Sequence, residues 1–216
     1  MTEVKHIVWD WNGTILDDND AVVLAVNRVC AQYDLAPIDL DRWRAIYRRP
    51  LRDCYAELLG REVTGADWAL IDKIYHDAYH DLLDICRLAS GVPDELHRLR
   101  DTGRAQSLLS MWFHHKLVPL VADYGLTDLF ARIDGLRLDL GGGSKAEHLA
   151  EHLAVQGLAG ADVLVIGDVT DDADAAAHVG ARCVLVTTGM MARQRLATRG
   201  VPVVDSIAEA LALLPA

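Results

Sequence analysis

Short apolar runs alternate with helical segments over most of the 216-residue chain, and this alternation limits its possible folds more than any other feature. The apolar runs are unbroken, as expected for strands that are buried on both faces of a parallel sheet. The expected strands are residues 6–10, 105–110, 163–168, 183–187 and 201–204. The expected helices among them are residues 92–99, 117–124, 145–156, 172–178 and 207–214. This order predicts an α/β fold with a mostly parallel, Rossmann-like sheet and helices on both faces.

One long segment interrupts the alternation. From residue 17 to residue 86 the sequence shows helical patterns and no strand candidate, and Pro50 and Gly60 separate the helices. We therefore expect two units. Residues 1–16 and 87–216 form the α/β core, and residues 17–86 form an inserted α-helical cap.

Charge and composition restrict the partners. Lys and Arg total 21 and Asp and Glu total 32, so the net charge is −11 at pH 7. A surface of this sign repels phosphate backbones, which argues against nucleic acid as a partner. No apolar run approaches the roughly 20 residues that cross a bilayer, and the N-terminus does not look like a secretory signal. The four cysteines have neither zinc-site nor disulfide spacing, so we expect buried free thiols in a cytoplasmic protein.

Polar side chains lie at the carboxyl ends of three expected strands, which is where open α/β sheets bind ligands. Asp10, Ser110 and Asp168 each end a strand, and Lys145 begins a helix after a glycine-rich stretch, residues 141–143. The sequence therefore predicts two acids, a hydroxyl group and an amine on one rim of the sheet.

Four motifs in this order resemble those of the haloacid dehalogenase superfamily. Its phosphatase members carry Asp-x-Asp-Gly-Thr, and residues 10–14 read Asp-Trp-Asn-Gly-Thr. Ser110 matches the Ser/Thr of the second motif, Lys145 the lysine of the third, and residues 167–172 the Gly-Asp-x-x-x-Asp of the fourth. The inserted helices are similar to the cap of the phosphoglycolate phosphatase and β-phosphoglucomutase branch. The resemblance implies a monomeric or homodimeric Mg²⁺-dependent phosphatase that hydrolyses a small phosphorylated metabolite.

The resemblance also implies roles for individual residues. Asp10 is the expected nucleophile, Lys145 holds it beside the phosphoryl group, and Ser110 donates a hydrogen bond to the phosphate. Oxygen-only ligands favour Mg²⁺, and a cation between a carboxylate and a phosphate removes their repulsion. The expected metal ligands are Asp10, Asp168, Asp172 and the backbone carbonyl of Asn12. Asp171 is the alternative to Asp172. The expected substrate-binding residues are Gly13, Thr14, Trp11, Met111, Arg48 and Arg52.

Asn12 is the main departure from the superfamily pattern. Phosphatases of the superfamily carry a second aspartate there, which protonates the leaving oxygen and later activates water. An amide cannot transfer a proton at neutral pH, and general acid–base catalysis contributes roughly 10²–10⁴-fold to a rate. His114 and His115 are candidates for a substitute proton carrier.

Three functions remain open because of this departure. The first is a phosphatase that has an easily displaced leaving group or another acid. The second is a weakly active or non-catalytic protein that binds a phosphorylated metabolite. The third, ranked last, is a dehalogenase or phosphonatase; the acidic fourth motif favours a metal, which dehalogenases do not use.

Arg48 and Arg52 flank Pro50 in the loop between two expected cap helices. In this superfamily the corresponding loop reaches the leaving-group end of the substrate, where arginine can bind a carboxylate or a second phosphate. A solvated basic turn is the alternative. His76 and His80 lie four residues apart on an expected helix, but without a third ligand they indicate a solvated helix face rather than a metal site.

Overall fold

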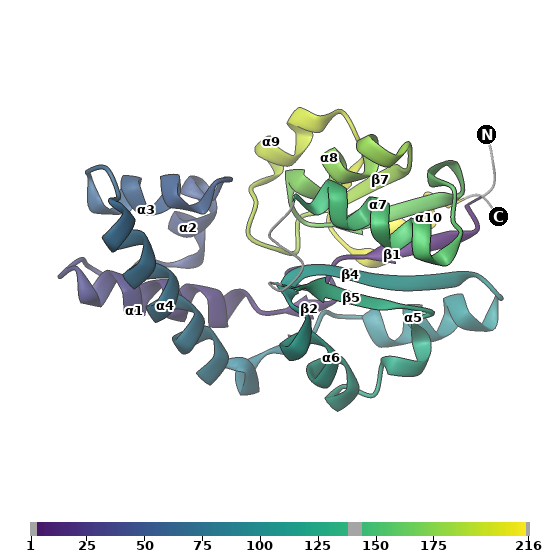
Figure 1. Ribbon diagram of the computed structural model, residues 1–216, viewed down its shortest axis with the longest axis horizontal. Helices are drawn as coiled ribbons and strands as arrows, with labels where there is room; N and C mark the ends of the chain where they lie inside the picture. Colours follow the sequence, from purple (N-terminus) through teal and green to yellow (C-terminus); the bar gives the residue numbers. More distant parts are fainter. Residues whose placement is uncertain (1–3, 138–143, 215–216) are drawn as a thin grey trace.

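The computed structural model describes residues 4–137 and 144–214. Its central sheet has the strand order β5-β4-β1-β6-β7-β8, and every neighbouring pair is parallel (Figure 1). The strands are β1 (His6–Trp9), β4 (Ala105–Phe113), β5 (Ile133–Leu136), β6 (Val163–Gly167), β7 (Arg182–Val186) and β8 (Val203–Val204). The predicted parallel α/β sheet is therefore confirmed. The predicted glycine-rich stretch, residues 141–143, lies outside the described residues.

Helices cover both faces of the sheet. Figure 1 shows α7 and α8 on one side and α5 and α6 on the other. The core helices are α5 (Val92–Asp101), α6 (His114–Asp123), α7 (Lys145–Gln156), α8 (Thr170–Val179), α9 (Arg193–Leu196) and α10 (Ile207–Ala212). Three short 3₁₀ turns accompany them: η2 (Thr127–Leu129), η4 (Gly160–Asp162) and η5 (Ala197–Arg199). All residues of β1 and β6 are buried, which explains why these strands carry no alternating polar positions.

The insertion, called the cap below, consists of helices that pack on one another beside the sheet (Figure 1). Its elements are α1 (Asn19–Gln32), α2 (Leu40–Ile46), α3 (Leu51–Leu59), α4 (Gly65–Asp81) and the 3₁₀ turn η1 (Leu83–Ile85). Thr64 and Asp67 form a capping box that fixes the start of α4, and Gly60 ends α3 in the left-handed conformation.

The two chain segments that join the cap to the core pair with each other. They are β2 (Leu16–Asp17) and β3 (Arg87–Leu88), which run antiparallel, with Leu16 opposite Leu88 and Asp17 opposite Arg87. The Ala89 amide also donates to the Ile15 carbonyl at 2.8 Å. Entry to and exit from the cap therefore lie side by side.

Four strands depart from the sequence prediction. β5 was not predicted, because Asp134 and Gly135 interrupt its apolar pattern. β2 and β3 are two-residue strands that are too short to give a periodic signal. β4 continues past the predicted end at Ser110 to Phe113, and its pairing with β5 shifts register between Leu109 and Phe113.

All four cysteines are buried free thiols, as expected. In the described part of the chain, no helix is both long and apolar enough to pass through a bilayer.

Candidate active site

The register of β1 places Asp10 at the carboxyl edge of the sheet. Trp9, the last residue of β1, pairs with Leu108 of β4 and with Ile166 of β6. The Asp10 amide then donates to the Ile166 carbonyl at 2.9 Å. Ser110 and Asp168 follow those two partners by two residues each, so the three polar side chains meet at one edge.

Two helix starts bring the remaining charged groups to the same edge. Ser144 and Glu147 form a capping box, so Lys145 is the first residue of α7. Asp172 lies in the first turn of α8, where its carboxylate accepts a hydrogen bond from the Val169 amide at 3.1 Å. Lys145 and Asp172 are buried, at 8% and 0% exposure.

Lys145 bridges two buried carboxylates. Its Nζ lies 2.5 Å from Asp10 Oδ1 and 2.5 Å from Asp172 Oδ1. Burial alone would lower the pKa of the Lys145 ammonium group, but the charges of Asp10 and Asp172 outweigh it and raise that pKa. Lys145 therefore stays protonated, and it fixes the position of the Asp10 carboxylate.

The site carries more negative than positive charge. Burial raises the pKa of Asp10 to about 6, even though Lys145 opposes the shift. Burial and the charges of Asp10 and Asp172 likewise raise the pKa of Asp168 well above its usual value. Three buried carboxylates face one ammonium group, so a cation at this point would remove a large unfavourable interaction.

The donor set suits a hard divalent cation. One carboxylate oxygen from each of Asp10, Asp168 and Asp172 can be chosen so that all three lie within 4.8 Å of one another. The set contains only oxygen atoms, which is the ligand type that Mg²⁺ prefers.

Two glycines make room for the Asp168 carboxylate. A Cβ atom on Gly13, whose φ is +70°, would lie 2.6 Å from Asp168 Oδ2, and one on Gly189 would lie closer still. The Asp168 Oδ2 atom accepts a hydrogen bond from the Met190 amide at 3.2 Å. The backbone is therefore shaped around this carboxylate in a way that any side chain at positions 13 or 189 would prevent.

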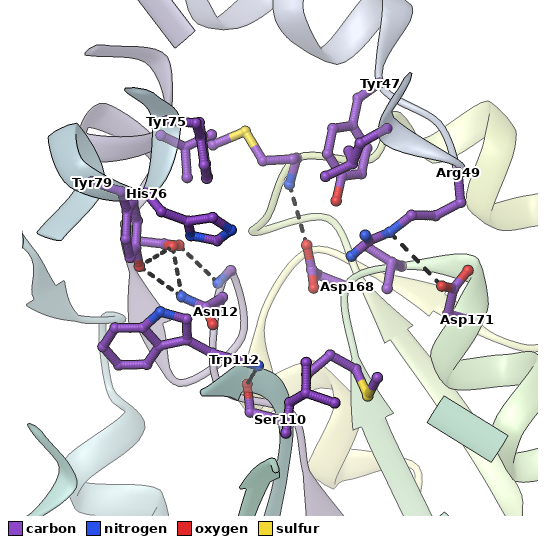
Figure 2. Close-up of a pocket in the computed structure, with 18 of the residues that line it drawn as sticks. Asn12, Tyr47, Arg49, Tyr75, His76, Tyr79, Ser110, Trp112, Asp168 and Asp171 are labelled. Atoms are coloured by element: carbon purple, nitrogen blue, oxygen red, sulfur yellow. Dashed lines mark hydrogen bonds and ion pairs between the residues drawn. The ribbon is translucent and has the colours of Figure 1, made fainter. Parts of the chain in front are cut away.

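Asn12 belongs to a hydrogen-bonded group that links the core to the cap (Figure 2). Asn12 Nδ2 donates to Asp18 Oδ2 at 2.9 Å and contacts the Tyr79 hydroxyl at 2.7 Å. The Tyr79 hydroxyl donates to Asp18 Oδ2 at 2.7 Å, and the Gly13 amide donates to Asp18 Oδ1 at 2.9 Å. The amide nitrogen of Asn12 is thus engaged on the cap side, because Tyr79 belongs to α4.

Sequence reasoning missed both Asp18 and Tyr79. Asp18 stands in an acidic run that is typical of a helix start, and only its burial and its three side-chain hydrogen bonds single it out. Burial raises the pKa of Asp18, although the hydrogen bond from Tyr79 opposes the shift.

A cavity of about 540 Å³ lies between the cap and this edge of the sheet. Asp10, Asn12, Ser110, Lys145 and Asp168 line it. Of the residues expected to bind substrate, Gly13 and Met111 also line it. The size falls within the range of small-molecule binding sites.

Trp11 and Thr14 do not line the cavity, contrary to expectation. Both side chains are fully buried, and the Trp11 ring packs against Tyr124 with centroids 6.1 Å apart. Both follow Asp10 closely in the sequence, but the tight turn after β1 directs them into the core. The structure therefore gives them a packing role.

The arginines of the cap loop are also placed differently from the expectation. Arg48 donates to the carbonyls of Ile46 and Asp53 at 2.9 Å each, and Arg52 donates to the Val63 carbonyl, so the cap itself uses both guanidinium groups. Arg49, between them, lines the cavity instead, with its Nε 3.8 Å from Asp171 Oδ2 (Figure 2).

Of the histidines considered in the sequence, some line the cavity and others do not. His114 and His115 do not line the cavity, and His114 Nδ1 accepts a hydrogen bond from the Gly135 amide at 3.1 Å. His76 of α4 does line it, 3.5 Å from Asp72 (Figure 2). His80 instead contacts the Lys116 amine at 3.1 Å. The structure therefore does not bring the two expected proton carriers to the site.

Comparison with known proteins extends over almost the whole chain. The family model for haloacid dehalogenase-like hydrolases matches residues 7–186. A phosphoglycolate phosphatase of Synechococcus elongatus is 28% identical over 196 residues, covering 89% of this chain and 88% of that protein. One from Rhodobacter capsulatus is 27% identical over 190 residues, covering 85% and 84%. A haloacid dehalogenase-like hydrolase structure from Streptococcus pneumoniae superimposes with a TM-score of 0.84 at 19% identity and covers 100% of both chains. The chain therefore belongs to the haloacid dehalogenase-like hydrolase family.

Proposed function

We propose that the protein is a Mg²⁺-dependent phosphatase that hydrolyses a small phosphorylated metabolite through an aspartyl-phosphate on Asp10. The observation that carries this proposal is the contact of buried Asp10 with Lys145, beside Asp168 and Asp172, at the floor of a cavity of metabolite size. The relatives named phosphoglycolate phosphatase support the same reaction class.

The chain's own residues account for the first chemical step. A bound Mg²⁺ would lie against Asp10 and Asp168 and would supply Lewis-acid stabilisation of the phosphoryl oxygens. An Asp10 oxygen attacks phosphorus, a P–O bond to Asp10 forms, and the P–O bond to the leaving alcohol breaks. Lys145 keeps the attacking carboxylate in place. The Ser110 hydroxyl accepts a hydrogen bond from the Trp112 amide at 3.1 Å, so its hydrogen is left to donate to a phosphoryl oxygen.

The second step returns the enzyme to its starting state. Water attacks phosphorus, the bond to Asp10 breaks, and inorganic phosphate leaves. Asn12 cannot take the proton of that water, and its amide nitrogen points to Asp18 and Tyr79. Water therefore has to carry protons to the leaving oxygen and away from the attacking water, which predicts slow turnover on esters of poor leaving groups.

The direct test is phosphate release from a panel of metabolite phosphates, with Mg²⁺ and with EDTA. We expect release that requires Mg²⁺ and is abolished in Asp10→Asn, which keeps the size of the side chain. Release that survives both EDTA and Asp10→Asn would rule out this mechanism.

Asn12 specifically favours a second candidate, a weakly active or non-catalytic protein that binds a phosphorylated metabolite. Calorimetry separates the two functions, because a binding protein shows heat of binding without phosphate release. A third function, as a dehalogenase or phosphonatase, fits less well with the acidic cluster of Asp10, Asp168 and Asp172.

A further inference from the structure

The cap side of the cavity is lined by aromatic rings. They come from α2, α3, α4 and the α2–α3 loop: Trp43, Tyr47, Tyr55, Trp68, Tyr75 and Tyr79. Several are in mutual contact; the Trp43 and Tyr55 centroids are 5.7 Å apart, and Tyr75 stacks on Tyr79 at 6.0 Å. Trp112, in β4, lines the facing wall and meets Tyr79 edge-on (Figure 2). The leaving group of a substrate held on Asp10 would therefore enter an aromatic chamber.

The charges along the cavity are unfavourable for an anionic leaving group. Among the described residues, its permanent cations are Lys145 and Arg49. Lys145 is held by Asp10 and Asp172, and Arg49 interacts electrostatically with Asp171, Asp168 and Asp10, on the phosphate side. On the cap side, Asp72 adds a negative charge to the lining. A carboxylate buried among these rings would lose its water without gaining a cation.

Trp43 gives an independent indication of a ligand. Its side chain is 2% exposed and lines the cavity, yet its indole N–H has no hydrogen-bond partner within the described part of the chain. A buried donor without a partner is unfavourable, and a bound molecule with an acceptor atom would satisfy it.

We infer that the substrate is a phosphomonoester whose alcohol part is an uncharged aromatic group, and not a small acid such as glycolate. This inference rests on the proposed phosphatase function. The cavity of about 540 Å³ leaves room for a ring beyond the phosphate, and aromatic walls favour a ring through apolar burial and through offset or edge-on contacts. The relatives named phosphoglycolate phosphatase would then differ from this chain in the leaving group that they accept.

The first test compares esters whose leaving oxygens are all primary alkoxides. We expect kcat/KM for 2-phenylethyl phosphate to exceed that for ethyl phosphate and for 2-phosphoglycolate at least tenfold. Tyr75→Leu should reduce that ratio at least threefold, whereas Tyr75→Phe, which keeps the ring, should preserve it. Equal values for the three esters in the wild-type protein would overturn the inference while leaving the phosphatase function intact.

The second test measures binding without turnover, by calorimetry in Mg²⁺ with phosphonates in which CH₂ replaces the ester oxygen. We expect 3-phenylpropylphosphonate to bind at least tenfold more tightly than propylphosphonate or 3-phosphonopropionate. Selective binding of the phenyl compound together with no phosphate release from any ester would contradict the phosphatase function and support the inferred ligand class. Equal or tighter binding of 3-phosphonopropionate, or no binding of the phenyl compound, would overturn the inference.

Discussion

Asn12 and Asp18 form an amide–carboxylate pair. The amide occupies position 12, where the superfamily resemblance implies a catalytic aspartate, and the acid occupies position 18. Asn12→Asp alone would place two carboxylates 2.9 Å apart, which is strongly repulsive. Exchanging the two residues, Asn12→Asp with Asp18→Asn, keeps one donor and one acceptor at that contact.

We therefore predict that the exchanged variant gains proton transfer at position 12. Its Mg²⁺-dependent turnover of ethyl phosphate should rise at least tenfold, which is part of the roughly 10²–10⁴-fold that fully aligned general acid–base catalysis supplies. Steady-state phosphate release measures the gain, and Asp18→Asn alone is the control that should show none. A folded exchanged variant with unchanged turnover would show that position 12 does not limit the rate.

Asp168 yields a prediction about metal binding. Asp168→Asn removes one of three clustered negative charges, so the metal-free variant should melt at a higher temperature than the wild-type protein. Mg²⁺ at roughly 100 times its Kd should stabilise the wild-type protein by about 2.7 kcal/mol and should stabilise the Asp168→Asn variant far less.

Thermal melts with and without Mg²⁺ check both the higher melting temperature of the metal-free variant and its smaller stabilisation by Mg²⁺. Asp171→Asn is the matched control, because Asp171 follows Asp168 by three residues and also lines the cavity, but its side chain is 40% exposed. If Mg²⁺ stabilised the Asp168→Asn variant but not the Asp171→Asn variant, Asp171 rather than Asp168 would be the metal ligand.

The motif pattern identified the acids and the lysine that the fold brings together, because each lies at a strand end or a helix start. It could not identify Asp18, Tyr79 or Arg49. Tyr79 and Arg49 belong to the cap, and which cap side chains face the sheet depends on how the cap helices pack against each other. Sequence spacing after motif I also suggested Trp11 and Thr14, which the tight turn buries.

At the level of elements, the α2–α3 loop and the first turn of α3 place three nearby arginines in two environments. Arg49 faces the cavity, while Arg48 and Arg52 donate to cap carbonyls. We predict that Arg49→Gln raises KM for phosphate esters severalfold with a smaller change in kcat, because uniform binding is lost.

Arg48→Gln and Arg52→Gln serve as matched controls for that prediction. They should leave KM unchanged and lower the melting temperature, since each removes donors to backbone carbonyls of the cap. Steady-state kinetics on the three variants would contradict this assignment if Arg52→Gln alone raised KM.

Elements with strong local signals were predictable from sequence. β1 and β6 are buried apolar runs, and capped helices such as α7 begin at Ser-x-x-Glu patterns. β5 was not, because Asp134 and Gly135 interrupt its apolar pattern, and the β2–β3 pair was not, because two residues are too few to give a periodic signal.

For the molecule as a whole, a buried series of side-chain hydrogen bonds connects β1, β4, β5 and α7. Ser107 Oγ of β4 lies 2.7 Å from Nε2 of His6 in β1 and 2.7 Å from Nε2 of His152 in α7. His152 Nδ1 lies 2.7 Å from Asp134 Oδ2 of β5. Burial, with a smaller contribution from nearby His152, lowers the pKa of His6 to about 4.

This lowered pKa predicts acid sensitivity of the whole fold. The unfolded chain binds a proton at His6 near pH 6.5, whereas the folded chain binds it only near pH 4. As the pH is lowered from about 6.5 to about 4, protonation of His6 should therefore reduce the free energy of unfolding, by about 3 kcal/mol in total. In urea unfolding between pH 7.5 and 4, the free energy of unfolding should depend less on pH in His6→Asn than in the wild-type protein. An equal flattening in His97→Asn, on the exposed face of α5, would argue against the assignment.

The β2–β3 pair has a consequence for how such a molecule can change over evolution. Where the chain leaves the sheet at Asp17 and where it returns at Arg87 are directly opposite each other, as close as the two ends of a hairpin turn. A short loop, or an unrelated module with adjacent ends, can replace everything between them without stretching the sheet. The sheet edge that carries Asp10 and the cap beside it can therefore change independently of each other.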